Sequence, residues 1–237
     1  NDCIIRWLPM LFVFIGGASA SGKTLFARDL VVALEVARIR AIKISLDDYY
    51  ITRSKRLKPI GDDDNPVSFD FPLLRDQLHQ LQSGESINKP LFSFELGERL
   101  IETVPIHTEG LDVVLIEGIL ALNEYESMQL KSKLGVFVET DFYLTYVYRR
   151  CVRDVNNERN TSVVETVDRE LRQGVRDAFF KHILPTKHNA DYAITNNYRI
   201  ENGLESNIED LPKAVSYLVS EITASIQSAN TQTALSL

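Results

Sequence analysis

Short apolar runs that alternate with longer amphipathic stretches set the expected architecture of this chain. Residues 11–15, 112–117 and 136–140 are almost continuously apolar, as strands buried on both faces of a parallel sheet are. Weaker runs at 41–45 and 193–195 have a similar character. The stretches between these runs place apolar residues at helical spacing. Strands that alternate with helices predict an α/β fold with a mostly parallel sheet flanked by helices on both faces.

Apolar stripes and breaker residues locate the remaining elements. The expected helices span residues 23–38, 71–81, 142–155 and 163–181, and a last helix begins at Pro212. Two β-like runs, 86–94 and 99–106, meet around Gly97 and predict a β-hairpin. Residues 51–68 are interrupted by prolines and glycine, which indicates an irregular segment.

Residues 17–24 match the phosphate-binding loop pattern G-x-x-x-x-G-K-[ST] without a mismatch. A buried strand precedes the match and a helix-forming segment follows it, as such a loop requires. Glycines let backbone N–H groups approach an anion, and the new helix presents unpaired N–H groups to it. We expect Lys23 to reach the β- and γ-phosphates of a nucleotide and the Thr24 hydroxyl to ligate Mg²⁺. The expected phosphate-binding residues are Gly17, Ala18, Ser19, Ala20, Ser21, Gly22, Lys23 and Thr24.

Acidic residues follow two of the expected strands. Asp47 comes just after the run at 41–45, and Glu117 ends the run at 112–117. Parallel sheets bind ligands beyond the carboxyl ends of their strands, where the phosphate loop also falls. We expect Asp47 to accept a proton from an acceptor hydroxyl or to lie near Mg²⁺, with Asp48 as the alternative. Glu117 is expected to orient the metal, because a carboxylate that ends a buried strand is costly without a partner. A turn cap, a helix cap or a salt bridge is the ordinary alternative role for either acid.

Arginines gather in the second half of the chain. Arg149 and Arg150 each lie on the same side of the expected helix as Arg153, and Arg159 follows in a polar break. Guanidinium groups suit phosphate oxygens because their N–H donors form a planar fork. A basic helix face is often only solvated, but here it accompanies a phosphate loop in an acidic protein. We therefore expect these four arginines to contact phosphates.

Bulk composition excludes several classes of function. The chain is 44% hydrophobic and 25% charged, which is ordinary for a globular protein. Its net charge of −7 argues against binding nucleic acid or a membrane surface. Cys3 and Cys151 form no C-x-x-C pair, and the four histidines have no zinc spacing. The pattern G-x-S-x-G of hydrolases is absent. Low cysteine usage favours a reducing compartment, and we expect a cytoplasmic protein.

We expect a single domain over residues 11–228, preceded by an extension at 1–10 and followed by a flexible tail at 229–237. The apolar start of the chain carries Arg6 and Pro9 and is too short to span a bilayer. It also lacks the basic start and the small-residue cleavage site of a signal peptide.

The order of motifs resembles that of the uridine–cytidine kinases, in the phosphoribulokinase and uridine kinase group of P-loop kinases. The likeness covers about residues 11–195. The motifs that carry it are GGASASGKT at 16–24, DDYY at 47–50, FDFP at 69–72, IEGIL at 116–120, RRCVRD at 149–154 and LPTK at 184–187. The resemblance implies phosphorylation of the 5′-hydroxyl of a nucleoside by ATP or GTP with Mg²⁺, a reaction of pyrimidine salvage.

The resemblance also implies roles for single residues. Asp47 is the implied catalytic acid/base, and Asp70 contacts the sugar hydroxyls. Arg150 and Arg153 belong to an arginine lid over residues 149–161. The predicted hairpin at 86–106 closes over the nucleoside as a substrate lid.

The chain departs from the family pattern where the family reads the base. Phe92 and Gly97 stand where the family has a tyrosine and a histidine, and Glu170 falls about where a glutamine is expected. One lid arginine is also missing, because the family's E-R-G-R reads ERNT at 158–161. Phe92 can still stack on a base but has no hydroxyl. The motifs for phosphoryl transfer are therefore intact, while those for base selectivity are altered.

Two alternatives stay open beside the nucleoside kinase. The first is a kinase of the same group that acts on another small alcohol, such as a sugar phosphate or a pantothenate-like acid. Arg99 and the basic run at 53–58 could supply cations for an anionic acceptor. The second is a nucleotide sensor without phosphoryl transfer, which the presence of Lys23, Thr24, Asp47 and Glu117 disfavours. The sequence leaves open the choice between ATP and GTP and whether the chain forms a homo-oligomer.

Overall fold

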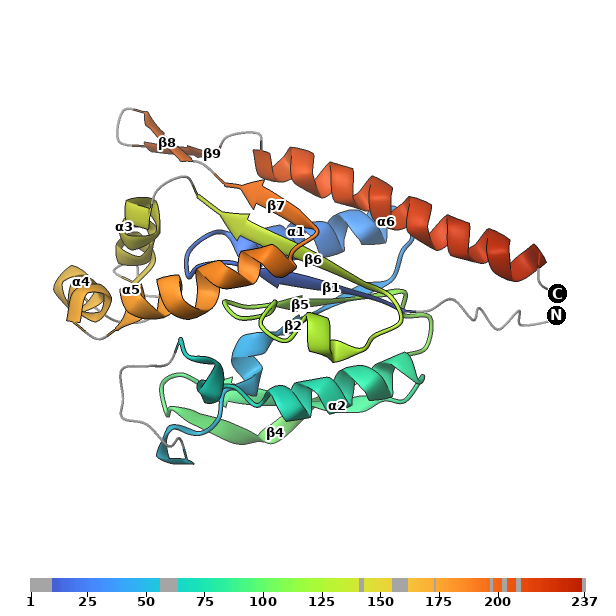
Figure 1. Ribbon diagram of the computed structural model, residues 1–237, viewed down its shortest axis with the longest axis horizontal. Helices are drawn as coiled ribbons and strands as arrows, with labels where there is room; N and C mark the ends of the chain where they lie inside the picture. The colour runs from blue at the N-terminus through green and yellow to red at the C-terminus, as the bar shows by residue number, and fades with distance from the viewer. Residues whose placement is uncertain are drawn as a thin grey trace.

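Five parallel strands form the central sheet of the protein, whose computed structural model is drawn in Figure 1. The strands are β1 (Leu11–Gly16), β2 (Ala41–Ser45), β5 (Val113–Glu117), β6 (Lys133–Glu139) and β7 (Tyr192–Thr195), in the order β2-β5-β1-β6-β7. The structure describes residues 10–55, 64–140, 143–154, 162–172, 174–196, 198–201, 204–207 and 210–235. All four strand pairings are parallel, which confirms the predicted sheet.

Helices cover both faces of this sheet. They are α1 (Lys23–Val36), α2 (Phe71–Gln82), α3 (Tyr143–Arg153), α4 (Val163–Arg172), α5 (Val175–Ala178) and α6 (Asp210–Leu235). Figure 1 shows α6 along the β7 side of the sheet and α2 along the β2 side. Among the described helices, none has the length and apolar character that a bilayer crossing requires.

The alternation of side chains along β1 divides the core into two halves. Leu11, Val13 and Ile15 pack in one cluster with apolar residues of α1 and α6, including Leu30 and Leu218. Phe12 and Phe14, which point to the opposite face, pack in a second cluster. That second cluster also contains Leu74, Leu78 and Leu81 from α2, with Phe179 and Ile183. The phosphate loop therefore follows a central strand that is buried on both faces.

The helices differ from the sequence expectation in two places. The helix expected over 163–181 divides, because Gly174 adopts φ 79° and separates α4 from α5. A π-helical turn, Phe179–Ile183, then replaces the end of the expected helix. The last helix carries the predicted apolar stripe and continues to Leu235, beyond the start of the tail predicted from residue 229.

The predicted hairpin is present as β3 (Ile87–Ser93) and β4 (Glu98–Ile106). It lies beside the 3₁₀ turn Leu46–Tyr49, which follows β2 and is here named the Asp47 turn. A second hairpin, β8 (Tyr198–Glu201) with β9 (Leu204–Asn207), was not predicted from the sequence. Residues 1–9 of the predicted extension, part of the basic run at 53–58 and the lid residues 155–161, including Arg159, lie outside the described residues.

Candidate active site

The phosphate loop joins β1 to α1 and depends on two glycines. Gly17 has φ 142°, and a Cβ atom on it would lie 2.2 Å from the carbonyl oxygen of Val138. Gly22 has φ 95°, and a Cβ atom there would lie 2.2 Å from the side-chain nitrogen of Asn196. Neither place accommodates a side chain, because L-residues disfavour these backbone angles and the neighbouring atoms are too close. The two glycines of the motif are therefore required by their positive φ angles and by the atoms packed against them.

Asn196 fixes the loop from the far side of the sheet. Its buried side chain donates a hydrogen bond of 2.7 Å to the carbonyl of Ser21. The backbone carbonyl of Asn196 accepts a hydrogen bond of 2.8 Å from Arg149. Arg149 therefore reaches the loop through Asn196 in this structure. Asn196 was not predicted as a site residue from the sequence. It could have been found because it is the first residue after β7, the last strand of the central sheet, at the edge where ligands bind.

Lys23 is buried and lies at the centre of the site's charges. Its Nζ donates to the carbonyl of Ala18 at 3.3 Å. Burial lowers the pKa of the Lys23 ammonium, the nearby carboxylates of Glu117 and Asp47 oppose this shift, and Arg153 adds to it. Lys23 therefore lies near Asp47 and Glu117, the two acids expected at the site.

Glu117 contacts each of the elements around it. Its Oε2 accepts from Thr24 Oγ1 at 3.1 Å, and its Oε1 accepts from Ser45 Oγ at 3.2 Å. Lys43 Nζ lies 3.6 Å from the same Oε1. Ser45 and Glu117 are register partners on β2 and β5, and Lys43 precedes Ser45 by two residues on the same face of β2. The buried carboxylate is therefore fully partnered, and Lys43 and Ser45 are site neighbours that the sequence analysis missed.

The two adjacent acids of the Asp47 turn have different environments. Asp47 is half-buried, and its carboxylate opposes the lowering of the Lys23 pKa. Asp48 instead forms an ion pair with Lys89, which comes from β3 of the hairpin. The ion pair joins Asp48 to the hairpin, whereas Asp47 lies near Lys23.

Arg150 and Arg153 have different partners. Arg153 NH1 donates to Ser19 Oγ at 3.3 Å, while its Nε donates to Asp154 at 2.9 Å. Arg150 is buried and pairs with Glu170 at 2.9 Å, with Asp64 4.0 Å away. Of these two predicted lid arginines, Arg153 contacts the phosphate loop directly, whereas Arg150 pairs with carboxylates.

The two charged residues expected on the acceptor side are bound to each other. Arg99 NH1 donates to Asp70 Oδ2 at 3.0 Å, and Arg99 NH2 donates to the carbonyls of Tyr49 and Tyr50 at 3.2 Å each. The other oxygen of Asp70 accepts from the backbone N–H of Leu73 and so caps α2. Arg99 therefore links the hairpin to the end of the Asp47 turn.

Aromatic rings line the same region. Phe92 lies 5.4 Å from Tyr50 and 5.4 Å from Phe94, and Tyr50 lies 4.1 Å from Phe69, measured between ring centroids. Tyr50, Phe69 and Phe94 were not singled out from the sequence as site residues. Gly97 has φ 68°, and a Cβ atom on it would lie 2.8 Å from Arg53 Cδ. Arg53 therefore covers the space into which a residue 97 side chain would extend.

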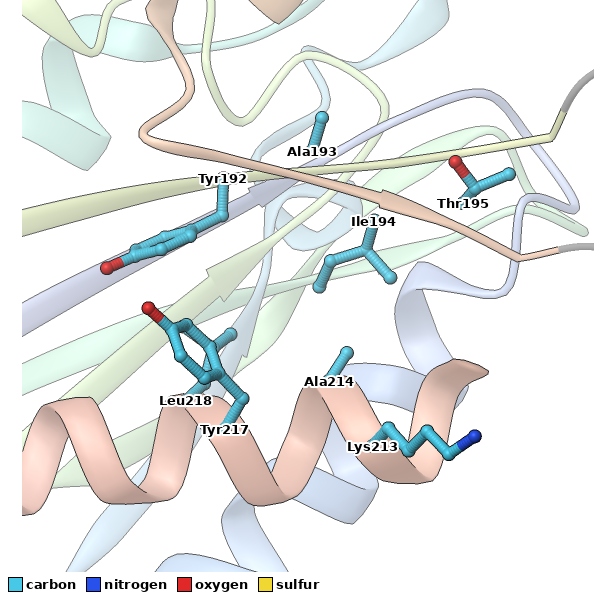
Figure 2. Close-up of a pocket in the computed structure, with 8 residues that line it drawn as sticks. All are labelled: Tyr192, Ala193, Ile194, Thr195, Lys213, Ala214, Tyr217 and Leu218. Atoms are coloured by element: carbon cyan, nitrogen blue, oxygen red, sulfur yellow. The ribbon is translucent and has the colours of Figure 1, made fainter. Parts of the chain in front are cut away.

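The described residues contain no group of three or more His, Cys, Asp or Glu side chains placed to hold a metal ion by themselves. The oxygens that could hold a cation are those of Thr24 and Glu117, which lie within hydrogen-bond distance of each other. A cavity of about 510 Å³ lies elsewhere, between β7 and α6. Figure 2 shows the rings of Tyr192 and Tyr217 toward one end of it and Lys213 toward the other. None of the predicted site residues lines this cavity.

Comparisons with known proteins identify the family of this chain. The model of the phosphoribulokinase / uridine kinase family matches residues 12–199. A uridine kinase of Ureaplasma parvum is 32% identical over 187 residues, 78% of this chain and 87% of that protein. Uridine-cytidine kinase B of Dictyostelium discoideum is 36% identical over 183 residues, 76% of this chain and 72% of that protein.

A solved structure shares the fold at low identity. It is provisionally described as a fructose transport system kinase of a Silicibacter species, and it superposes with a TM-score of 0.64 at 18% identity. The match covers 81% of this chain and 92% of the other. The extent of the family match and the identity to uridine kinases confirm the resemblance inferred from the motifs. The chain belongs to the phosphoribulokinase / uridine kinase family and is a P-loop kinase, a phosphotransferase with an alcohol acceptor.

Proposed function

We propose that this kinase transfers the terminal phosphoryl group of ATP or GTP to the 5′-hydroxyl of a nucleoside such as uridine or cytidine. One observation carries the proposal: Lys23, the Thr24–Glu117 pair and Asp47 meet at the carboxyl ends of β1, β5 and β2. A protein that only senses nucleotide needs no proton acceptor beside the phosphate cradle. The uridine kinases among its relatives support the choice of acceptor.

The residues around the cradle suit a nucleotide with Mg²⁺. Gly17 and Gly22 give the loop the positive φ angles that turn backbone N–H groups toward an anion, and Lys23 supplies a cation. Thr24 and Glu117 would hold the metal, with Asp47 as a further oxygen ligand close by. Bound Mg²⁺ neutralises charge on the phosphate oxygens. Oxygen ligands of this kind match the preference of Mg²⁺, so the donor set fits the ion.

Asp47 accepts the proton of the acceptor hydroxyl as the phosphoryl group is transferred. Lys23 and Arg153 stabilise the negative charge of the phosphates, Lys23 from within the loop and Arg153 beside Ser19. Arg149 acts through Asn196, and Arg150 would exchange its carboxylate partner for a phosphate oxygen when nucleotide binds.

On the acceptor side, Asp70 would contact the sugar hydroxyls and Phe92 would stack on the base. Asp70 is already oriented by Arg99 and by its cap on α2, so it offers fixed acceptor oxygens. Phe92 belongs to an aromatic cluster with Tyr50 and Phe94, which gives a flat ring an apolar surface.

A second acceptor class is supported by the altered hairpin. Phe92 lacks a hydroxyl, and Arg53 covers Gly97 where the family has a histidine. A site that loses hydrogen-bonding groups discriminates less strongly between bases. A guanidinium at this position is compatible with a small anionic alcohol, such as a sugar phosphate or a pantothenate-like acid.

The experiment that separates these acceptors is ADP release from Mg·ATP with a panel of alcohols. The panel contains uridine, cytidine, two purine nucleosides, ribulose 5-phosphate and pantothenate, with GTP as the second donor. We expect turnover with uridine or cytidine. Turnover only with an anionic alcohol would replace the nucleoside by the second class. Nucleotide binding without turnover on any acceptor would contradict the proposed transfer.

A further inference from the structure

The β3–β4 hairpin is attached to the Asp47 turn at several points. Lys89 on β3 forms an ion pair with Asp48, and its Nζ also donates to the carbonyl of Pro90 at 3.1 Å. On the opposite strand, Arg99 donates to the carbonyls of Tyr49 and Tyr50. The hairpin therefore contacts the turn from both of its strands.

A third connection runs through α2. The buried Tyr49 hydroxyl donates to Gln77 Oε1 at 2.7 Å, and Gln77 Nε2 donates to the carbonyl of Asn88 at 2.8 Å. Burial raises the pKa of the Tyr49 hydroxyl, with the Asp48 charge adding to the shift, so the group remains a donor. Asn88 directly precedes Lys89, and both routes therefore fix the same part of β3.

Lys89 is an unusual residue for such a contact because it is almost completely buried. Only 8% of its surface is exposed, and Asp48 is largely covered as well. An ammonium group in this position is stable only while a carboxylate pairs with it. Asp48 follows Asp47 directly in the turn, so the ion pair fixes the backbone that carries Asp47.

We propose that Lys89 is a positioning residue for phosphoryl transfer, which holds the Asp47 turn in its productive place by anchoring Asp48 to the hairpin. The inference rests on the proposed role of Asp47 as proton acceptor. The hairpin then has two roles, because it forms a wall of the acceptor site and also sets the position of the acid. The two adjacent aspartates then have separate roles: Asp47 accepts the proton, and Asp48 anchors the turn to the hairpin.

The first test measures the position of the turn without any acceptor. Hydrogen–deuterium exchange, followed by mass spectrometry of peptides, is compared between the wild type and Lys89→Met. We expect amides in peptides covering 46–52 to exchange about tenfold faster in the variant, because a local anchor is lost. The Ile51 N–H bond to Ser68 and the Asp70 N–H bond to Tyr49 report on this segment. Exchange in α1 is expected to stay unchanged.

Lys131→Met is the matched control. Lys131 is an exposed lysine just before the amino end of β6, whereas the Asp47 turn follows the carboxyl end of β2. It removes the same charge from the protein and should leave exchange at 46–52 as in the wild type. Asp48→Asn breaks the ion pair from its other side and should also speed exchange there. Asp48→Asn keeps the proposal testable if Lys89→Met does not fold.

Kinetics with the best acceptor of the panel form the second test. We expect Lys89→Met to lower kcat about 10- to 100-fold with the KM for ATP within twofold, because a misplaced acid affects transfer and not nucleotide binding. Lys89→Arg should recover most of kcat. The double variant Lys89→Met/Asp48→Asn should be no worse than Lys89→Met alone, since both changes remove one interaction.

Unchanged exchange at 46–52 in Lys89→Met, or an equal rise in Lys131→Met, would overturn the proposal. Faster exchange with a wild-type kcat would show that the turn need not be held, and would overturn it as well. Failure of the proposed function looks different: Asp47→Asn would then keep full turnover, or the wild type would transfer to no acceptor, whatever the exchange result.

Discussion

Lys23 illustrates how one buried charge can serve a phosphate site. Burial lowers the pKa of its ammonium, and the carboxylates of Glu117 and Asp47 compensate in part. Its hydrogen bond is to the Ala18 carbonyl of the same loop. Arriving phosphates offer a better counter-charge, so the lysine contributes most when a nucleotide is bound.

Asp47 gives the most direct prediction at the level of single residues. Asp47→Asn should reduce kcat by about 10²- to 10⁴-fold, because the amide cannot accept the proton of the acceptor hydroxyl. ATP affinity should change little, because the phosphate loop and Lys23 are retained. The measurement is steady-state turnover together with ATP binding by calorimetry.

Asp29→Asn is the control for this change. Asp29 is half-buried on α1 and pairs with the exposed Arg28, so its loss should leave both turnover and binding near the wild-type values. A near-normal kcat in Asp47→Asn would remove Asp47 from the proposed mechanism and transfer the role to Asp48.

At the level of elements, the end of β7 supports a loop that lies far from it in sequence. Asn196 reaches the phosphate loop at the Ser21 carbonyl, 175 residues away along the chain. It also receives Arg149 from α3 and bonds through its N–H to the Glu139 carbonyl at the end of β6. Three elements therefore determine the shape of a loop that the sequence motif alone describes as local.

Asn196→Ala should therefore weaken ATP binding about tenfold, because the Ser21 carbonyl loses its buried side-chain partner, while the bond from Arg149 to the backbone carbonyl at position 196 is kept. Asn189→Ala is the matched control, since Asn189 also donates a side-chain hydrogen bond to a backbone carbonyl, that of Leu122, but away from the loop. Both variants should be less stable to urea, and only Asn196→Ala should lose ATP affinity. Equal affinities in the two folded variants would show that Asn196 does not shape the phosphate site.

The elements also show where pattern reasoning succeeds and where it fails. The apolar runs located all five strands of the sheet and the β3–β4 hairpin, because burial on a parallel sheet imposes continuous apolarity. The same reasoning joined α4 and α5 into one helix. Gly174 interrupts them with a positive φ, which helical periodicity does not reveal because the apolar spacing continues across it.

At the level of the whole molecule, nucleotide binding should stabilise the fold through the phosphate loop. Mg·ATP at about 100 times its Kd should raise the free energy of unfolding of the wild type by about 2.7 kcal/mol. Lys23→Met should keep its ligand-free stability or gain some, since it removes a buried cation, and should lose most of the ATP effect and all turnover. Thermal unfolding with and without Mg·ATP measures both effects. An ATP-dependent rise as large as that of the wild type in Lys23→Met would count against the phosphate-loop assignment.

The sequence by itself determined the family, the parallel sheet and the phosphate loop, and it predicted residues for phosphoryl transfer. These features are encoded in contiguous stretches, in which spacing and apolar content act on near neighbours. Only the tertiary structure decided which side chains meet across the fold. Thr24 donates a hydrogen bond to Glu117, and Arg99 donates one to Asp70. Lys89 forms an ion pair with Asp48, and Asp47 lies near Lys23. Such partners lie between 24 and 93 residues apart in the chain, and strand order and register, which no local pattern contains, bring them together.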